Sequence, residues 1–569
     1  MENALQHRSA PAELPSGSAS EVAPFARQTV ELTKQAYIQL KWAASYWQAQ
    51  YDRATVREAT LKQEVTAQAA QIRDLTQRLY GKKSEKGAGH QPARAPSPRR
   101  RGQQQGSKGH GRTTRLQLPV SEEVHDIPVD HQHCPVCGNP YEAFPGTEDS
   151  ELVEVHIQAH IRRIKRKRYH KGCQCPGSPG IITAAPASRL LPKTPLGVSV
   201  WTVVLLDKYL YARPTHRLCE EFRHCGFPIA QGTLTDGLKR LAPLFAPVME
   251  ALRDKQMSEA LFHNDETRWE VFEAVPGKHG HRWYLWVTRS GAVVFYQMAA
   301  SRGAVVPQGH FAGVQALEVV VVCDRYAAYK CLAKSQDAII LAFCWAHVRR
   351  DFLDAARSWP EWAAWMFEWV DDIRELYHLN AARLEVWEAE QPLPPQSLEF
   401  QDRQSSLVNK LTQMQTRWAA QLQDKRLPHA KRKVLTSLKN HWAGLCVFVD
   451  HPAVPMDNNA AERALRNPVI GRKNYYGAGS VWSAQLAAVM FSVLQTVLLW
   501  GLNPHHWLQV FLQACADNGR KPPADLSGFL PWTMSAARKH QLSQPVPIQV
   551  LNLRSELLAL SPPHVSDTS

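Results

Sequence analysis

The chain has 569 residues and a formal net charge of +15, with 67 lysine and arginine residues against 52 aspartate and glutamate residues. A single hydrophobic core rarely organises so long a chain, because domains average roughly 100–200 residues. The length therefore excludes a one-domain protein. The basic excess favours a polyanionic partner such as nucleic acid or an anionic membrane surface.

Residues 1–30 show no secretory signal pattern and are expected to be a disordered lead. The longest apolar run, residues 486–502, is shorter than the roughly 20 residues of a membrane span and contains Gln495 and Thr496, which predicts a buried helix. Eleven cysteines without a signal segment predict reduced thiols or metal ligands, as in the cytoplasm. These features point to a reducing compartment rather than to disulfide bonds.

Residues 31–80 are expected to form a helical segment that ends in a coiled coil. Steps of four and three residues connect a seam that is apolar except at Gln68. The seam consists of Leu61, Val65, Gln68, Ile72, Leu75 and Leu79. It predicts a homo-oligomer, and the alternative is an amphipathic helix that packs on its own chain.

Residues 81–118 are expected to form a flexible basic linker. The stretch 81–115 carries ten lysine or arginine residues against one glutamate, with many glycines and no apolar periodicity. Such a linker either contacts phosphates without sequence preference or serves as a solvated tether.

Residues 119–190 are expected to form a small zinc-binding domain. Two cysteine pairs, CPVCG and CQC, can together enclose a tetrahedral Zn²⁺ ion, and the glycine suits the turn that ligation needs. The ligands are Cys134, Cys137, Cys173 and Cys175, with His131, His133 and His170 as substitutes. Between the pairs, residues 161–171 hold seven lysine or arginine residues, which predicts a DNA-facing hairpin; the alternative is a solvated charged face. Its expected DNA-binding residues are Arg163, Lys165 and Arg166.

Residues 191–255 are expected to be helical. A helical pattern from Arg213 is broken at Gly226, and a second helix opens near Gln231 or Thr233. This order predicts a helix-turn-helix whose second helix could read a major groove, and the alternative is an ordinary helical hairpin.

Residues 256–356 and 451–520 are expected to form two parts of an α/β catalytic domain. Apolar residues precede Asp265 in the sequence, and the predicted buried strand LEVVVVC ends at Asp324. Both carboxylates then lie at strand ends of one mixed sheet, and Glu462 on a later helix is a third. Two aspartates and one glutamate can hold two Mg²⁺ or Mn²⁺ ions about 4 Å apart for in-line phosphoryl transfer. Each aspartate taken alone would suit a turn or cap instead.

Glu462 stands in a segment that is otherwise amide and basic. Its spacing from Asn459 fits a capping box, and its spacing from Arg466 fits an ion pair one turn on. The partner aspartates favour a metal ligand among cations that hold the DNA backbone. These cations are Arg463, Arg466, Arg472 and Lys473, and His347, Arg349 and Arg350 are further expected phosphate contacts.

The 137 residues between Asp324 and Glu462 exceed one crossover and predict a helical insertion over residues 357–450. Its core is expected to contain tryptophans that recur at helical spacing, namely Trp362, Trp365 and Trp369. Cys344 is expected to be a small buried residue. Residues 521–569 are expected to be a C-terminal tail.

Four motifs carry a resemblance to a known family: DET at Asp265, CDRYAAY around Asp324, CWAHVRRDF from Cys344 and DNNAAERALRNPVIGRKN from Asp457. They resemble the DDE-type transposases of the insertion sequence 66 family, and the similarity extends in order through RLYGKKSE, the basic linker and the cysteine quartet. The resemblance implies a multidomain α+β protein with a ribonuclease H-like catalytic fold, in which Asp265, Asp324 and Glu462 are the acidic triad. It also implies two small accessory proteins of the same element as partners.

The resulting hypothesis is a DNA transposase that hydrolyses the phosphodiester at element ends and joins the freed 3′-hydroxyl to target DNA. It would use two Mg²⁺ or Mn²⁺ ions per active site and one structural Zn²⁺ ion. One alternative is a ribonuclease H-like nuclease that cuts without joining. Another is a catalytically inactive, DNA-binding repressor, against which the three intact acids argue.

Overall fold

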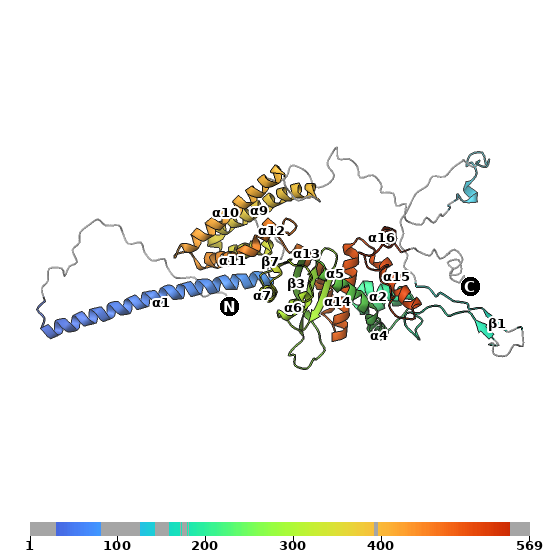
Figure 1. The fold of residues 1–569 in the computed structure, drawn as a ribbon, viewed down its shortest axis with the longest axis horizontal. Coiled ribbons are helices and arrows are strands. Elements are labelled where there is room, and N and C mark those ends of the chain that lie inside the picture. The colour runs from blue at the N-terminus through green and yellow to red at the C-terminus, as the bar shows by residue number, and fades with distance from the viewer. Residues whose placement is uncertain are drawn as a thin grey trace. The chain divides into compact units, whose positions relative to one another are not determined.

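The computed structural model describes residues 30–80, 124, 126–142, 159–170, 172, 179, 181–391 and 397–546. Residues 1–29 of the expected lead, the whole expected basic linker, Cys173, Cys175 and the end of the expected tail lie outside these residues. The chain divides into two compact units, residues 1–85 with 357–359, and residues 86–356 with 360–569. The first contains one long helix, and the second contains a five-stranded sheet (Figure 1).

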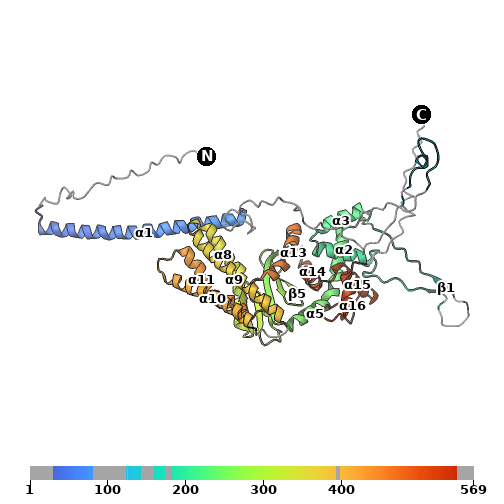
Figure 2. The same cartoon turned by 90° about the horizontal axis from the view of Figure 1, so that it is seen from above.

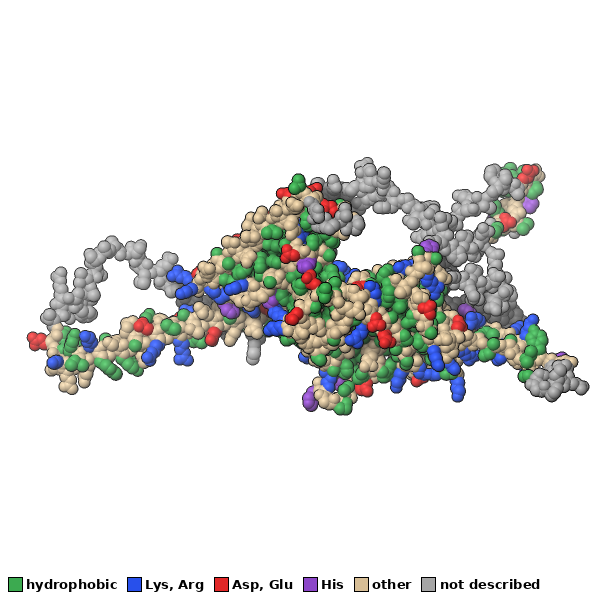
Figure 3. Space-filling model, viewed as in Figure 1, with side chains coloured by type: hydrophobic (Ala, Val, Ile, Leu, Met, Phe, Trp, Pro, Cys, Tyr) green, Lys and Arg blue, Asp and Glu red, His purple; other side chains and the backbone are tan. Residues whose placement is uncertain are grey.

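Helix α1 (Lys34–Tyr80) is continuous over 47 residues, which confirms the helical part of the prediction for this segment. Its apolar seam faces solvent within this unit, because Leu61, Val65, Ile72 and Leu75 are 48–64% exposed. Figure 3 shows hydrophobic side chains along the helix. The coiled coil that would cover them stays a prediction.

Two short strands follow in the described part of the expected zinc-binding region. Strands β1 (Arg168–His170) and β2 (Ile181–Thr183) pair antiparallel, after the 3₁₀ turn η1 (Val129–His131). All six strand residues are exposed. A small ribbon therefore stands at the place where the sequence predicts a basic hairpin.

A mixed sheet is the centre of the second unit. Its strands are β3 (Leu261–Glu270), β4 (Arg282–Arg289), β5 (Val294–Ala299), β6 (Val319–Cys323) and β7 (Ile339–Phe343). They lie in the order β5-β4-β3-β6-β7; β3, β4 and β5 pair antiparallel, whereas β6 runs parallel to β3 and β7. Every residue of β6 is buried, as is typical of a parallel strand that is covered on both faces.

Helices cover both faces of this sheet (Figures 1 and 2). On one face, α6 (Val305–Phe311) and α7 (Ala327–Ser335) pack around Phe262 and Trp286. On the other face, α13 (Asn459–Tyr475) packs on β3, and α14 (Val481–Leu499) packs on β5. Pro468 inside α13 has no backbone N–H, which frees the Ala464 carbonyl to accept a hydrogen bond of 2.7 Å from the Tyr296 hydroxyl on β5.

The hydrophobic core on the α13 and α14 face also includes helices that precede the sheet in the chain, and one that follows it. The preceding helices are α2 (Val198–Tyr209), α3 (Thr215–His224), α4 (Gln231–Leu241), η2 (Ala242–Phe245) and α5 (Ala246–Met257), and the following one is α15 (Pro504–Asp517). The second helix of the predicted helix-turn-helix begins at Gln231, as expected. A Cβ at Gly237 would stand 1.9 Å from the Trp201 ring, so only glycine lets α4 approach α2 this closely. One hydrophobic core thus crosses the domain boundary expected near residue 255.

The expected tail contributes to the same core. Phe529, Met534 and Leu542 are at least 92% buried, the last of them on α16 (Ala536–Ser543). The packed part of the chain therefore extends well beyond the boundary expected at residue 521.

The expected insertion is helical. Helix α8 (Trp345–Ser358) leads into it from the preceding segment, and its elements are η3 (Pro360–Trp362), α9 (Ala363–Glu390), α10 (Leu398–Gln423), α11 (His429–Leu445) and α12 (Val447–Asp450). Trp369 is fully buried, and the Lys431 ammonium lies over the rings of Trp362 and Trp365. Helix α11 packs on β7, where a Cβ at Gly444 would stand 2.5 Å from Phe343. Trp369 is a core residue, as expected, whereas Trp362 and Trp365 are only partly buried.

Helix α14 contains most of the apolar run expected to form a buried helix. By length and composition alone this helix could cross a membrane, but most of it is buried inside the protein. Eleven of its residues, including Phe491 and Leu494, are buried in the core. The burial confirms the prediction of a core helix, and this feature does not indicate a membrane protein.

Candidate active site

Asp265 lies on β3, just after the residues of this strand that pair with its parallel neighbour β6. Burial raises the pKa of its carboxyl to about 8, and the nearby charge of Glu266 acts in the same direction. The carboxylates of Asp324 and Glu462 raise this pKa further, whereas a backbone hydrogen bond from Glu266 opposes the rise. Asp324 and Glu462 are therefore both close enough to Asp265 to act on its charge.

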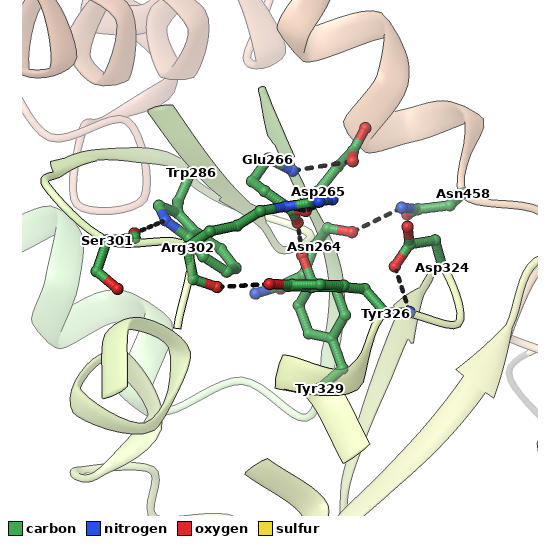
Figure 4. A network of polar contacts seen from close by, with 10 residues as sticks. All are labelled: Asn264, Asp265, Glu266, Trp286, Ser301, Arg302, Asp324, Tyr326, Tyr329 and Asn458. Atoms are coloured by element: carbon green, nitrogen blue, oxygen red, sulfur yellow. Dashed lines mark hydrogen bonds and ion pairs between the residues drawn. The ribbon is translucent and has the colours of Figure 1, made fainter. Parts of the chain in front are cut away.

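Asp324 follows β6 directly, as the pattern of buried valines predicts. Its Oδ1 accepts a hydrogen bond of 2.9 Å from the backbone N–H of Tyr326, which fixes the carboxylate at the strand end (Figure 4). The next residue, Arg325, donates to Asp351 on α8 and to Ser437 on α11, at 2.6 and 3.0 Å. The insertion thus anchors the loop that carries Asp324.

Glu462 lies one turn into α13, and the structure contradicts the capping alternative. The helix begins at Asn459, whose N–H donates to Asp457 Oδ1 at 3.0 Å, and no side chain of Asn458 or Asn459 caps the helix. Glu462 Oε1 is instead buried without a hydrogen-bond partner. Its acidic side chain also forms no ion pair with Arg466 in the described chain.

Asn458 fastens the start of α13 to the sheet, and its role escaped the sequence analysis. Its side-chain N–H₂ donates to the Asn264 carbonyl at 2.7 Å (Figure 4). Its Oδ1 lies 3.2 Å from His263 Nδ1. Its backbone N–H donates to Cys344 Sγ at 3.2 Å. These contacts bring a helix that lies far along the chain against β3, and they hold Glu462 beside Asp265.

His347 faces Glu462 from the first turn of α8. Its Nε2 lies 3.7 Å from Glu462 Oε1, and its Nδ1 is buried without a hydrogen-bond partner. Burial lowers the pKa of the imidazole, and the Arg350 charge lowers it further, whereas Glu462 opposes this change. Cys344, directly before α8, is buried as expected. Cys344, His347 and Glu462 place potential ligand atoms within 4.8 Å of one another.

The side chain of Glu266 points to the opposite face of β3, where both of its carboxylate oxygens accept hydrogen bonds. Tyr329 donates to its Oε2 at 2.7 Å, and Arg302 donates to its Oε1 at 2.6 and 2.9 Å (Figure 4). The Arg302 guanidinium stacks on the Tyr326 ring, 4.0 Å from its centroid. The sequence analysis missed this network because its members come from β3, α7 and the loop after β5, with no shared spacing. The adjacent acids of the DET motif were the only available signal.

The cations expected around Glu462 separate into two groups. Arg463, Arg466 and Lys473 are exposed on α13. Arg472 is partly buried instead and donates to Thr267 Oγ1 and to the Arg268 carbonyl, so it holds α13 to β3. Three of the four cations are therefore solvent-exposed on α13, while the fourth contributes to packing.

The remaining expected DNA contacts lie elsewhere. Arg350 is exposed and Arg349 partly buried on α8. Arg163 and Lys165 are exposed before β1, and Arg166 donates to the Ala184 carbonyl at 2.6 Å across the ribbon.

The first cysteine pair forms a tight turn that suits a metal. Cys134 accepts backbone hydrogen bonds at its thiol from Val136 and Cys137, which lower its pKa. Gly138 closes the turn with φ of +77° and donates to the Cys134 carbonyl at 2.9 Å. A thiol that accepts backbone N–H groups fits the thiolate that Zn²⁺ requires. Cys173 and Cys175 lie outside the described residues.

These features agree with the family to which the chain belongs. Residues 193–486, more than half of the 569, match the transposase IS66 family, so the chain belongs to this family. The match confirms the resemblance, and family membership implies DNA processing, DNA binding and the use of divalent metal.

Three curated relatives from Sinorhizobium fredii (strain NBRC 101917 / NGR234) cover most of the chain. The uncharacterized protein y4jD is 24% identical over 441 residues, which are 74% of this chain and 82% of the relative. The uncharacterized protein y4hP is 26% identical and covers 71% and 74%, and the uncharacterized protein y4qI is 25% identical and covers 78% and 79%. No solved structure matches the chain.

Proposed function

We propose that the protein is a DDE-type DNA transposase whose acidic triad is Asp265, Asp324 and Glu462. The observation that carries the proposal is that Asp324 and Glu462, which come from segments up to 197 residues away from each other and from Asp265, both act on the Asp265 carboxyl; burial and the Glu266 charge raise the pKa of Asp265 to about 8, and these two carboxylates add to the rise. In the described chain, none of the three forms an ion pair with lysine or arginine. Converging acids without a compensating cation destabilise the metal-free fold, and a divalent cation would relieve that cost.

The strand order supports a ribonuclease H-like catalytic domain. Three antiparallel strands followed by two parallel ones put β3 and β6 side by side, so that Asp265 and Asp324 share one edge. Helix α13 then supplies Glu462 from the adjacent face. This arrangement supports the proposal of the fold that the family resemblance implies.

The three acids fit Mg²⁺ or Mn²⁺, because carboxylate oxygens are the ligands that these cations prefer. When bound, two such ions stabilise the attacking and leaving oxygens of an in-line displacement at phosphorus. The chain's own residues hold the acids in place: the Tyr326 N–H orients Asp324, and Asn458 holds α13 against β3. Exposed Arg463, Arg466 and Lys473 would bind the DNA backbone beside the acids.

Other parts would serve recognition and assembly. The Cys134 and Cys137 turn would hold one structural Zn²⁺ with Cys173 and Cys175. The ribbon with Arg163, Lys165 and Arg166, and helix α4, would contact DNA. Helix α1 would pair chains in a homo-oligomer, and two small proteins of the same element would assist in the cytoplasm.

The proposal is tested by incubating purified protein with a DNA fragment that carries paired element ends, a target plasmid and Mg²⁺. Nicks that leave 3′-hydroxyls at the ends, followed by joined products, are expected. Nicks without joining would support a nuclease. Binding to the ends without any nick, in Mg²⁺ and in Mn²⁺, would contradict an enzymatic role and support a repressor.

A further inference from the structure

Cys344, His347 and Glu462 form a donor set that the proposed magnesium chemistry does not use. Their potential ligand atoms lie within 4.8 Å of one another, and His347 Nε2 stands 3.7 Å from Glu462 Oε1. A tetrahedral Zn²⁺ with metal–ligand distances of about 2.0–2.3 Å separates its ligand atoms by roughly 3.3–3.8 Å. A small contraction would therefore bring all three donors to zinc distance.

The donors are held in place by the backbone and have unused coordinating atoms. Burial raises the pKa of the Cys344 thiol, and Sγ accepts N–H groups of Asn458, His347 and Ala346, which oppose this rise and hold the sulfur in place. Both His347 Nδ1 and Glu462 Oε1 are buried without a hydrogen-bond partner. Buried polar atoms are rarely left unpaired in native proteins, so an orphan nitrogen and an orphan oxygen in one cluster point to a missing ligand.

The chemistry of the set selects a different metal from the triad. A thiolate and an imidazole favour zinc, whereas Mg²⁺ prefers carboxylate oxygens and water. Three protein ligands leave a fourth tetrahedral position for water. The two candidate metal sites share one residue, Glu462.

We infer that Cys344, His347 and Glu462 bind one Zn²⁺ ion, and that zinc bound there withdraws Glu462 from the magnesium-binding acids and inhibits DNA cleavage. The zinc binding stands on the geometry alone, whereas the inhibition rests on the proposed function. Zinc at this site therefore inhibits the enzyme, whereas magnesium at the acids supports cleavage.

The binding half is tested by counting zinc in the full-length protein after equilibration with Zn²⁺ and removal of free metal. The variant is Cys344→Ser, which keeps a hydrogen-bond acceptor for the Asn458 N–H but removes the soft ligand. The matched control is Cys446→Ser, which removes a partly buried thiol outside the cluster. The wild type and the control should bind one more zinc per chain than Cys344→Ser, and Co²⁺ should lose thiolate charge-transfer absorbance only in that variant.

Equal zinc counts in the wild type and a folded Cys344→Ser protein would overturn the site. If thermal unfolding shows that this variant does not fold, His347→Gln serves in its place, and the same loss of one zinc is expected.

The inhibition half is tested by titrating Zn²⁺ into cleavage reactions at fixed Mg²⁺, with each protein normalised to its own rate without zinc. Half-inhibition of Cys344→Ser should need at least about tenfold more zinc than the wild type, since even outer-shell partners change metal affinity by about 10- to 100-fold. Zinc that binds without slowing cleavage would overturn the inhibition. A lost zinc in Cys344→Ser, with no Mg²⁺-dependent cleavage by any protein, would contradict the proposed function and leave the zinc site standing.

Discussion

Two adjacent acids, Asp265 and Glu266, lie on opposite faces of strand β3 and have opposite electrostatic surroundings. On one face, burial and the Glu266 charge raise the pKa of Asp265, and the charges of Asp324 and Glu462 raise it further. On the other face, Glu266 accepts hydrogen bonds from Tyr329 and Arg302, which oppose the effect of burial on its pKa. Side chains alternate between the faces of a strand, so neighbouring acids can have different hydrogen-bond and ion-pair partners even where their charges act on each other.

The difference separates a structural acid from a functional one. A buried carboxylate with its own cation contributes to the fold and needs nothing further. Carboxylates that converge without a cation destabilise the fold unless a metal joins them, and perturbed groups of this kind cluster at functional sites. The Asp265 face therefore carries the proposed chemistry, and the Glu266 face supports it.

The largest expected effect follows from removing one charge on the Asp265 face. Glu462→Gln, Asp265→Asn and Asp324→Asn should each lower Mg²⁺-dependent cleavage by about 10³-fold or more, with DNA binding and folding retained. Double variants should be scarcely worse than single ones, because the acids act as one unit. Gel assays of nicked product provide the measurement. Near-normal cleavage by Glu462→Gln would remove it from the triad.

Glu266→Gln is the matched control on the other face. It keeps the size of the side chain and its contact with Tyr329, so cleavage should remain within about tenfold of the wild type. A loss as large as that of Asp265→Asn would show that the distinction between the two faces is wrong.

The second effect concerns stability on the Glu266 face. Arg302→Gln leaves the buried Glu266 carboxylate with Tyr329 alone and should lower the free energy of unfolding by about 1–3 kcal/mol, a range that allows for the partial exposure of Arg302. Denaturant unfolding measures this change. Glu266→Gln added to Arg302→Gln should restore part of the loss, and a double variant less stable than Arg302→Gln would argue against an electrostatic cause.

A smaller effect on stability should follow from a change of pH when a chelator has removed divalent metal. Because the folded pKa of Asp265 is about 8, above its ordinary value of 3.8, the metal-free fold loses stability as pH rises toward 8. The buried His263, with its pKa lowered to about 4, acts in the opposite direction only below about pH 6.5. Between pH 6.5 and 8, thermal unfolding should therefore show the wild type losing up to about 2 kcal/mol relative to Asp265→Asn. Parallel curves for the two proteins would contradict the raised pKa.

The smallest expected effect tests how the helix is joined to the sheet. Asn458→Ala removes the contacts to Asn264 and His263 and should cost about 1 kcal/mol of stability. Cleavage should fall more than DNA binding, because Glu462 would be less firmly held beside Asp265. Unchanged cleavage in a variant with lowered thermal stability would limit Asn458 to a purely structural role.

Local patterns were enough to predict most elements that carry the acids. Buried valines before Asp324 and an apolar approach to Asp265 predicted two strand ends, and the helix that carries Glu462 was recognisable from its motif. The apolar run around Phe491 predicted a buried helix in the same way. These signals are readable because the hydrophobic pattern of a strand or helix is written in consecutive residues.

Contacts between distant segments decided the rest. The sequence could not show that the Asp457 side chain accepts the first backbone N–H of α13, in place of a cap by Asn459. Nor could it show that Glu462 Oε1 has no hydrogen-bond partner. It also could not show that Arg302 neutralises Glu266, because their partnership depends on how β3 and the loop after β5 approach each other. Periodicity by itself determined which segments form strands and helices, whereas only the tertiary structure decided which carboxylates remain uncompensated, since charge balance depends on neighbours in space rather than along the chain.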